Sequence, residues 1–227
     1  MRLDLHAIDH HLLVGLNPKA GGKMGRLAGL LGILGVAAGF AFPLYFGALD
    51  PAYDPARDFI SELGDATAPD AWAVNWIGFL PTGLLLIAFA GAAWAALPRS
   101  AATAFAMIGV ILFAGGYVGA AFFPCDTGCS GSSSSFSQQM HYATGLPGYF
   151  LAPVTMLLLG FAARRWPGGA WIAPLAFLGA IGTFAGLSGT VNAFESDTPG
   201  LWQRLLEYSF LIPTLAVSCY LLVRPEN

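Results

Sequence analysis

The chain has 227 residues, of which 56% are apolar and 10% are charged, and its formal net charge is −3. A soluble domain carries roughly 25% charged residues, so this composition excludes a water-soluble globule and predicts a membrane protein. No basic stripe or nucleic-acid recognition motif is found in the sequence, and nucleic acid is therefore not expected as a partner.

Long apolar stretches predict the fold. A helix needs about 20 apolar residues to cross a bilayer, and six stretches meet this length, at residues 27–49, 72–97, 101–123, 142–164, 170–191 and 204–223. We therefore expect an all-α, polytopic bundle of six transmembrane helices, forming a single domain over residues 27–227. Most spans contain proline, which tends to kink a helix; these are Pro43, Pro81, Pro147, Pro153, Pro174 and Pro213.

Residues 1–26 are expected to form a cytoplasmic amphipathic lead. Its apolar residues can share one face of a short helix lying on the membrane; they are Leu3, Leu5, Ile8, Leu12 and Leu13. Asn17, Pro18, Gly21 and Gly22 are expected to end that helix. The histidines at 6, 10 and 11 are either polar residues of this interfacial helix or part of a metal site that lacks a third firm ligand.

The cationic residues indicate the orientation of the spans. If the N-terminus lies inside, the inner segments hold Arg2, Lys19, Lys23, Arg26, Arg99, Arg164, Arg165 and Arg224, whereas the outer segments hold only Arg57 and Arg204. Cytoplasmic loops are enriched in Lys and Arg. We therefore expect a multi-pass protein of the inner (plasma) membrane with both termini in the cytoplasm.

Two spans carry stripes of glycine at intervals of three and four residues. They are Gly25, Gly29, Gly32, Gly35 and Gly39 in the first span, and Gly179, Gly182, Gly186 and Gly189 in the fifth. Small residues on one face let helices approach closely. The stripes predict tight packing within the chain, and contact with a second copy or a larger membrane complex is the alternative.

The outer loops contain a pair of cysteines and a short helix signal. Cys125 and Cys129 lie four residues apart in a loop placed outside, where an oxidising environment favours a disulfide; two free thiols are the alternative. In the first outer loop, Asp58 is expected to cap a short helix that contains Ser61 and Glu62 and ends at Gly64.

Polar residues gather at the outer ends of the predicted helices and suggest a ligand-binding pocket. We expect it to be built from Asp58, Ser61, Glu62, Asn75, Asp126, His141, Glu195 and Arg204. Ionisable groups near an apolar core often mark a functional site. Each residue also has a simpler structural interpretation: His141 can bond a loop carbonyl, Arg204 can pair with Glu207 instead of an anionic ligand, and Asp58 and Glu62 can be solvated instead of holding a divalent metal.

Several motifs, taken together, resemble a known family. They are Asp58-Phe-Ile-Ser61-Glu62-Leu-Gly64, Asn75-x-x-Gly78-Phe79, Phe123-Pro124-Cys125-Asp126 and His141-x-x-x-Gly145. Their order is similar to that of the membrane-protein family called domain of unknown function nine-nine-eight, and the first loop is distantly similar to Frag1/DRAM-type membrane proteins. The resemblance implies six membrane helices and no settled activity.

Three functions are compatible with the sequence. The first is a membrane protein whose outward polar pocket binds a lipid headgroup or a small polar ligand, with membrane lipids as partners. The second is a metal-assisted lipid hydrolase at the outer face, and the third is an accessory subunit of a larger membrane complex. The sequence predicts no particular cofactor, and a divalent metal is the alternative. It does not decide whether the protein is an enzyme.

Overall fold

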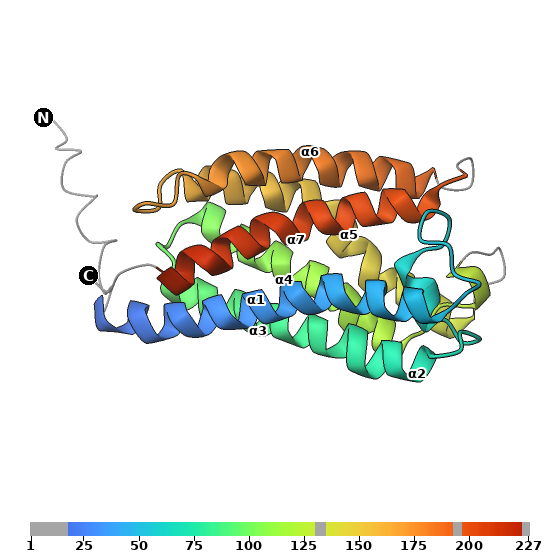
Figure 1. The fold of residues 1–227 in the computed structure, drawn as a ribbon. Coiled ribbons are helices and arrows are strands. Elements are labelled where there is room, and N and C mark those ends of the chain that lie inside the picture. The colour runs from blue at the N-terminus through green and yellow to red at the C-terminus, as the bar shows by residue number, and fades with distance from the viewer. Residues whose placement is uncertain (1–17, 130–134, 193–196, 224–227) are drawn as a thin grey trace, which may run out of the picture.

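The computed structural model describes residues 18–129, 135–192 and 197–223 (Figure 1). Within these ranges the regular structure is helical, and six helices are long and apolar enough to cross a membrane. Five are single helices: α1 (Pro18–Leu49), α4 (Ala101–Phe122), α5 (Phe136–Ala163), α6 (Ile172–Val191) and α7 (Pro199–Val223). The other span, Ala71–Ala96, joins α2 (Ala71–Ala73), the π-helical segment η3 (Val74–Phe79) and α3 (Leu80–Ala96).

The predicted six-helix fold is confirmed, with differences at the helix starts. α5 begins at Phe136 and α7 at Pro199, several residues before the starts expected from hydropathy alone. α1 begins at Pro18 and runs through Gly21 and Gly22, so the first span starts earlier than expected, whereas the short lead helix that these residues were expected to end lies outside the described residues. The remainder of the predicted lead, including its three histidines, lies outside the described residues.

Local sequence explains several helix boundaries. The hydroxyl of Ser100 accepts a hydrogen bond from the Thr103 amide at 3.0 Å and caps α4, and Ser135 caps α5 in the same way. The π-helical segment η3 ends at Phe79, two residues before Pro81. A proline lacks an N–H donor and its ring clashes with the preceding turn, which accounts for the local widening of the helix.

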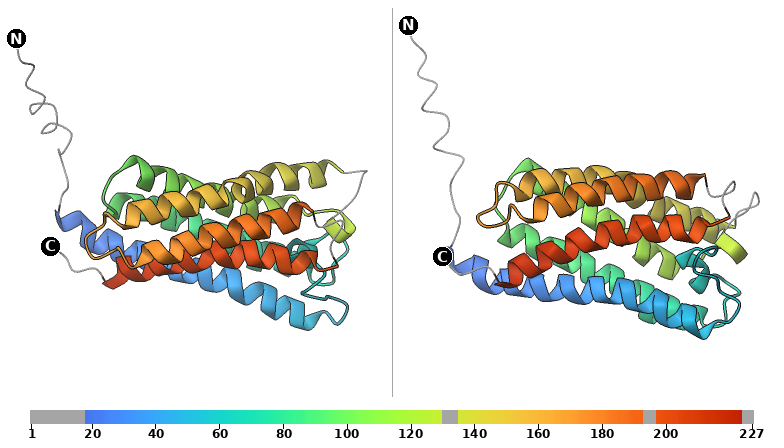
Figure 2. Two further views of the ribbon diagram at one scale, coloured as in Figure 1. Left: turned by 90° about the horizontal axis from the view of Figure 1, so that it is seen from above. Right: turned by 45° about the horizontal axis from the view of Figure 1, so that its top comes forward.

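The six spans form a closed ring in chain order. Each span packs against the next one, and α7 completes the ring against α1 (Figures 1 and 2). The start of α1 and the end of α7 lie at one end of the bundle. The opposite end carries two short 3₁₀ helices, η2 (Ile60–Gly64) and η4 (Thr127–Cys129), and is called the η2 end below.

Both glycine stripes are used for packing inside the chain. A methyl group on Gly32 would meet side chains of α3 and α7, and one on Gly186 would meet the backbone of α7. The predicted close approach of helices is therefore found at α1 and α6. Large apolar side chains such as Leu34, Phe105 and Ile181 are exposed on the outside of the bundle, where they suit contact with lipid.

Candidate ligand-binding cavity

The first long connection, residues 50–70 between α1 and α2, folds back over the bundle at the η2 end. It is called the first connection below. Its helix η2 contains Ser61 and Glu62 and ends at Gly64, as predicted. The cap predicted on Asp58 is wrong, because the Glu62 carboxylate accepts the Phe59 amide at 2.8 Å and Asp58 accepts the Asp54 amide instead. Burial raises the pKa of Glu62, while the bond from the Phe59 amide opposes that shift.

Arg204 fastens this connection to α7. Its guanidinium donates to the carbonyl oxygens of Asp58 at 3.0 Å and Gly200 at 3.1 Å, and to the Tyr53 hydroxyl. Tyr53 in turn donates to the Phe59 carbonyl at 3.1 Å. Burial raises the pKa of Tyr53 to about 12, with the nearby Arg204 acting in the opposite direction. Arg204 is thus engaged with the loop and its own helix.

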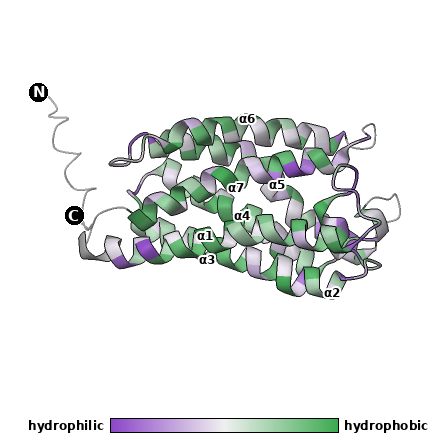
Figure 3. Cartoon of the chain, viewed as in Figure 1, coloured by the Kyte–Doolittle hydropathy of each residue, from purple (hydrophilic) through white to green (hydrophobic). Residues whose placement is uncertain are grey.

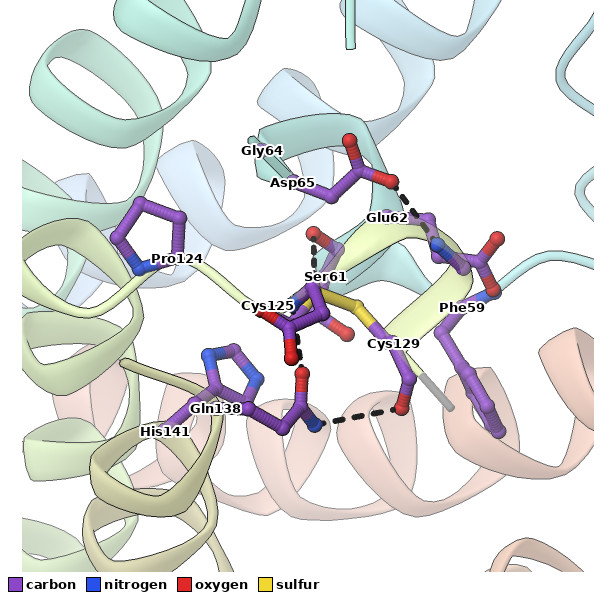
Figure 4. The surroundings of a disulfide bond; sticks show 12 residues. Phe59, Ser61, Glu62, Gly64, Asp65, Pro124, Cys125, Cys129, Gln138 and His141 are labelled. Carbon is purple, nitrogen blue, oxygen red and sulfur yellow. Dashed lines mark hydrogen bonds between the residues drawn. A yellow bond between two sulfur atoms is a disulfide. The ribbon is translucent and has the colours of Figure 1, made fainter. Parts of the chain in front are cut away.

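A disulfide between Cys125 and Cys129 shapes the second connection, as predicted (Figure 4). η4 is joined to the first connection because Asp65 accepts the Gly128 amide at 3.1 Å and Ala66 donates to the Cys125 carbonyl at 3.3 Å. The two connections therefore form one layer over the ring of helices.

A cavity of about 710 Å³ lies beneath this layer. Its walls come from η2, η3, η4, α4, α5, α6 and α7. Figure 1 shows α5 beside α6 at the end where the two are connected and apart from it at the η2 end. A ring of six helices that widens in this way cannot fill its centre with its own side chains. The volume lies within the roughly 300–1,000 Å³ typical of small-molecule sites.

The lining of the cavity is mostly apolar and aromatic, and it reaches the outer face of the bundle. Leu146 and Phe150 of α5 and Val191 of α6 belong to the lining, yet they are 39%, 54% and 52% exposed. The cavity consequently extends between α5 and α6 to a surface that is itself apolar.

The polar centre of the cavity is Glu207 of α7, which is 4% exposed. Tyr117 of α4 donates to one carboxylate oxygen, and Tyr149 of α5 donates to the other at 2.5 Å. Gln203 donates to the Tyr149 hydroxyl at 3.0 Å and accepts the Ile60 amide at 2.5 Å. This hydrogen-bonded chain joins α4, α5, α7 and η2. Figure 3 shows hydrophilic residues in the part of α7 near the η2 end.

The structure brings together some of the predicted site residues and separates others. Ser61, Glu62 and His141 line the cavity. The His141 Nδ1 donates to the Phe123 carbonyl at 2.9 Å, which is the structural alternative considered for this residue. Asp58 and Arg204 hold the first connection, as described above, and Glu195 lies outside the described residues.

The two remaining predicted residues, Asn75 and Asp126, serve the loops and are not in the cavity wall. The Asn75 amide donates to the Gly64 carbonyl at 2.9 Å. Both carboxylate oxygens of Asp126 accept hydrogen bonds from Ser135, and these bonds lower the pKa of Asp126. Ser135 thus satisfies Asp126, whereas the Asn75 Oδ1 is buried and has no hydrogen-bond partner among the described residues.

The site expected from the sequence did not include the residues at the polar centre of the cavity, and Glu207 was considered only as a partner of Arg204. Gln203 and Glu207 stand four residues apart in the last span and so share a helix face. A carboxylate one turn inside an apolar helix was the available signal. Tyr117 and Tyr149 gave no signal, since a tyrosine in a span usually reads as a packing residue.

The possible metal site is not assembled in the described part of the chain. There, no three His, Cys, Asp or Glu side chains come together as a group that could hold a metal ion. The carboxylates proposed for this role, Asp58 and Glu62, are engaged by backbone amides of the first connection.

Fold and cavity together define a polytopic integral membrane protein with an internal, largely apolar chamber at one end. The chain belongs to the family described as Protein of unknown function (DUF998), which matches residues 33–220 and so includes nearly all of the bundle. No curated protein and no solved structure shows significant similarity to the chain.

Proposed function

We propose that this membrane protein binds an amphiphile, a lipid or a lipid-like molecule, in the cavity at the η2 end. The observation that carries the proposal is the cavity of about 710 Å³, which joins an apolar wall open to the bundle surface with a buried carboxylate. An apolar tail suits the aromatic wall and the opening between α5 and α6. A polar head suits the centre formed by Glu207 and its hydrogen-bonding partners.

The lateral opening favours an amphiphile over a small polar ligand. A water-soluble molecule would leave most of the apolar lining uncovered, whereas burying a hydrocarbon tail there gains about 25 cal/mol for each Å² removed from water. The hydrolase alternative has no specific support, because the carboxylates of the first connection are engaged in loop contacts.

A cavity-blocking substitution tests the proposal. Gly145 lines the cavity, and a Cβ placed there would have no atom within 4 Å, so Gly145→Trp is expected to enter the chamber without disturbing a helix contact. Gly91 on α3 is also open at its Cβ and does not line the cavity, so Gly91→Trp is the matched control.

The measurement is native mass spectrometry of protein purified in a mild non-ionic detergent, before and after addition of total membrane lipid. Wild type and Gly91→Trp should retain a bound amphiphile, and Gly145→Trp should lose it while keeping its melting temperature. Equal retention by both variants, or no retention by the wild type after lipid addition, would contradict the proposal.

We further propose that the protein spans the inner (plasma) membrane, with the η2 end on the outer side and both termini in the cytoplasm. The bias of Lys and Arg toward the other end supports this orientation. Reporter fusions after Arg99 and after Arg165 should remain cytoplasmic, and a fusion at Gly131 should be exported. A cytoplasmic signal at Gly131 would reverse the orientation without affecting the cavity.

A further inference from the structure

The carboxylates that line the cavity are not matched by Lys or Arg side chains in its described wall. Its described lining includes two carboxylates, Glu62 and Glu207, and no Lys or Arg. The cation closest in sequence to Glu207 is Arg204, one turn earlier on α7. Arg204 does not line the cavity and borders a separate, smaller cavity of about 160 Å³ together with Tyr208, although its charge still attracts the Glu207 carboxylate.

Glu207 receives hydrogen bonds but no matching positive charge from the cavity wall. Its two oxygens accept the phenols of Tyr117 and Tyr149, which hold the carboxylate in place. A carboxylate in such apolar surroundings is costly unless a positive charge lies beside it. Arg204 spends its hydrogen bonds on the first connection and on Gly200, so the cavity side of the Glu207 carboxylate remains electrostatically complementary to a cation that enters with the ligand.

The two tyrosines that hold this carboxylate belong to a group of aromatic rings in the cavity wall. Phe113 lies 5.8 Å from Tyr149 and 6.1 Å from Tyr117 between ring centroids, and Phe79 lies 6.1 Å from Tyr117. All four rings belong to the cavity lining. Ring faces attract alkylammonium groups, and a buried carboxylate with several aromatic rings is a combination that suits such a cation.

We infer that the amphiphile bound in this cavity carries an ammonium group, which lies against the Glu207 carboxylate and the aromatic rings of the cavity wall. This inference rests on the proposed function and adds the chemical class of the ligand's head. The ammonium can belong to a simple amphipathic amine or to a zwitterionic lipid headgroup. Both present the same cation to Glu207, and the experiment below separates them.

The test uses three probes that share a dodecyl chain: dodecyltrimethylammonium, dodecylphosphocholine and dodecanol. Apparent dissociation constants are measured on wild-type protein in a non-ionic detergent by native mass spectrometry. The variant is Glu207→Gln, which keeps the size and the accepting oxygen of the side chain and removes its charge. The control is Asp70→Asn, which removes an exposed charge outside the cavity.

Wild type and Asp70→Asn should bind the trimethylammonium probe about tenfold more tightly than dodecanol. Glu207→Gln should lose that preference and keep its affinity for dodecanol. Tight binding of dodecylphosphocholine as well would assign the site to a zwitterionic headgroup, and its rejection would assign the site to a simple amine.

Equal binding of the cation and dodecanol by the wild type would overturn the inference and leave the proposed function standing. This comparison needs no variant, so it decides the matter even if Glu207→Gln does not fold. An unchanged preference in a folded Glu207→Gln would also overturn the inference. Failure of all three probes to bind, with no lipid retained from the membrane, would contradict the proposed function itself.

Discussion

Replacing Arg204 by methionine should loosen the layer of loops that covers the cavity. The side chain is 9% exposed and donates to the carbonyls of Asp58 and Gly200 and to the Tyr53 hydroxyl. Methionine keeps the apolar stem and removes every donor. A hydrogen bond to a charged group contributes about 1.5–3 kcal/mol. Because the Gly200 carbonyl lies within α7 itself, only the two bonds to the first connection are counted in full.

Those two bonds give an expected loss of about 3 kcal/mol, after allowing for water reaching the loop. For a chain of this length the loss corresponds to a fall of roughly 6–12 °C in melting temperature. Hydrogen exchange should rise in residues 50–65 before it rises in the helices. Arg57→Met is the control, because Arg57 is exposed and lies in the same connection.

The assay is thermal unfolding in detergent, combined with hydrogen exchange read by mass spectrometry. A Tyr53→Phe variant completes a double-mutant cycle. Because Arg204 and Tyr53 share a hydrogen bond, the double variant should lose less stability than the sum of the losses in the two single variants. If Arg204→Met matches Arg57→Met within about 0.5 kcal/mol, and residues 50–65 exchange as in the wild type, then Arg204 does not hold the layer.

Three other predictions concern the disulfide, a helix contact and a buried acid. Cys125 and Cys129 should react with a maleimide only after reduction. Reduction should lower the free energy of unfolding by about 2 kcal/mol, because the disulfide closes a short loop. Full labelling of unreduced, denatured protein would contradict this prediction. Gly148→Ala should cost about 1–3 kcal/mol, since its Cβ would lie 2.6 Å from the α4 backbone, whereas Gly91→Ala should cost nothing. Burial raises the pKa of Glu62, so its proton favours the folded state; that contribution is complete below the unfolded pKa and is lost as pH rises through the folded pKa. The difference in stability between wild type and Glu62→Gln should therefore shift against the wild type as the pH rises from 4 to 7, and a difference independent of pH would refute it.

The helices were predictable because hydropathy is a property of each segment by itself. Every span follows from about 20 apolar residues, and the disulfide followed from two cysteines four residues apart. Helix starts were less predictable, because polar residues such as Gln138 and His141 lie inside α5 although they lower its local hydropathy. Their polar groups are satisfied by the loops, and the helix can include them.

The cavity was only partly predictable because it depends on how distant segments meet. Sequence reasoning placed His141 and Glu62 correctly at one end of the bundle, but it could not separate the two faces of α7. Gln203 and Glu207 face the cavity, whereas Arg204 faces the first connection. The phenols that hold Glu207 come from α4 and α5, and nothing in either segment by itself indicates a carboxylate partner.

The central claim, that an amphiphile occupies the cavity at the η2 end, is tested most directly by photo-crosslinking. A lipid bearing a diazirine on its acyl chain is irradiated with the protein in nanodiscs, and the labelled peptides are identified by mass spectrometry. We predict labelling of cavity-lining peptides around Phe113, Leu146 and Leu187, and its loss in Gly145→Trp. Labelling confined to outward, lipid-facing residues such as Leu34 and Phe105, and unchanged in Gly145→Trp, would contradict the claim.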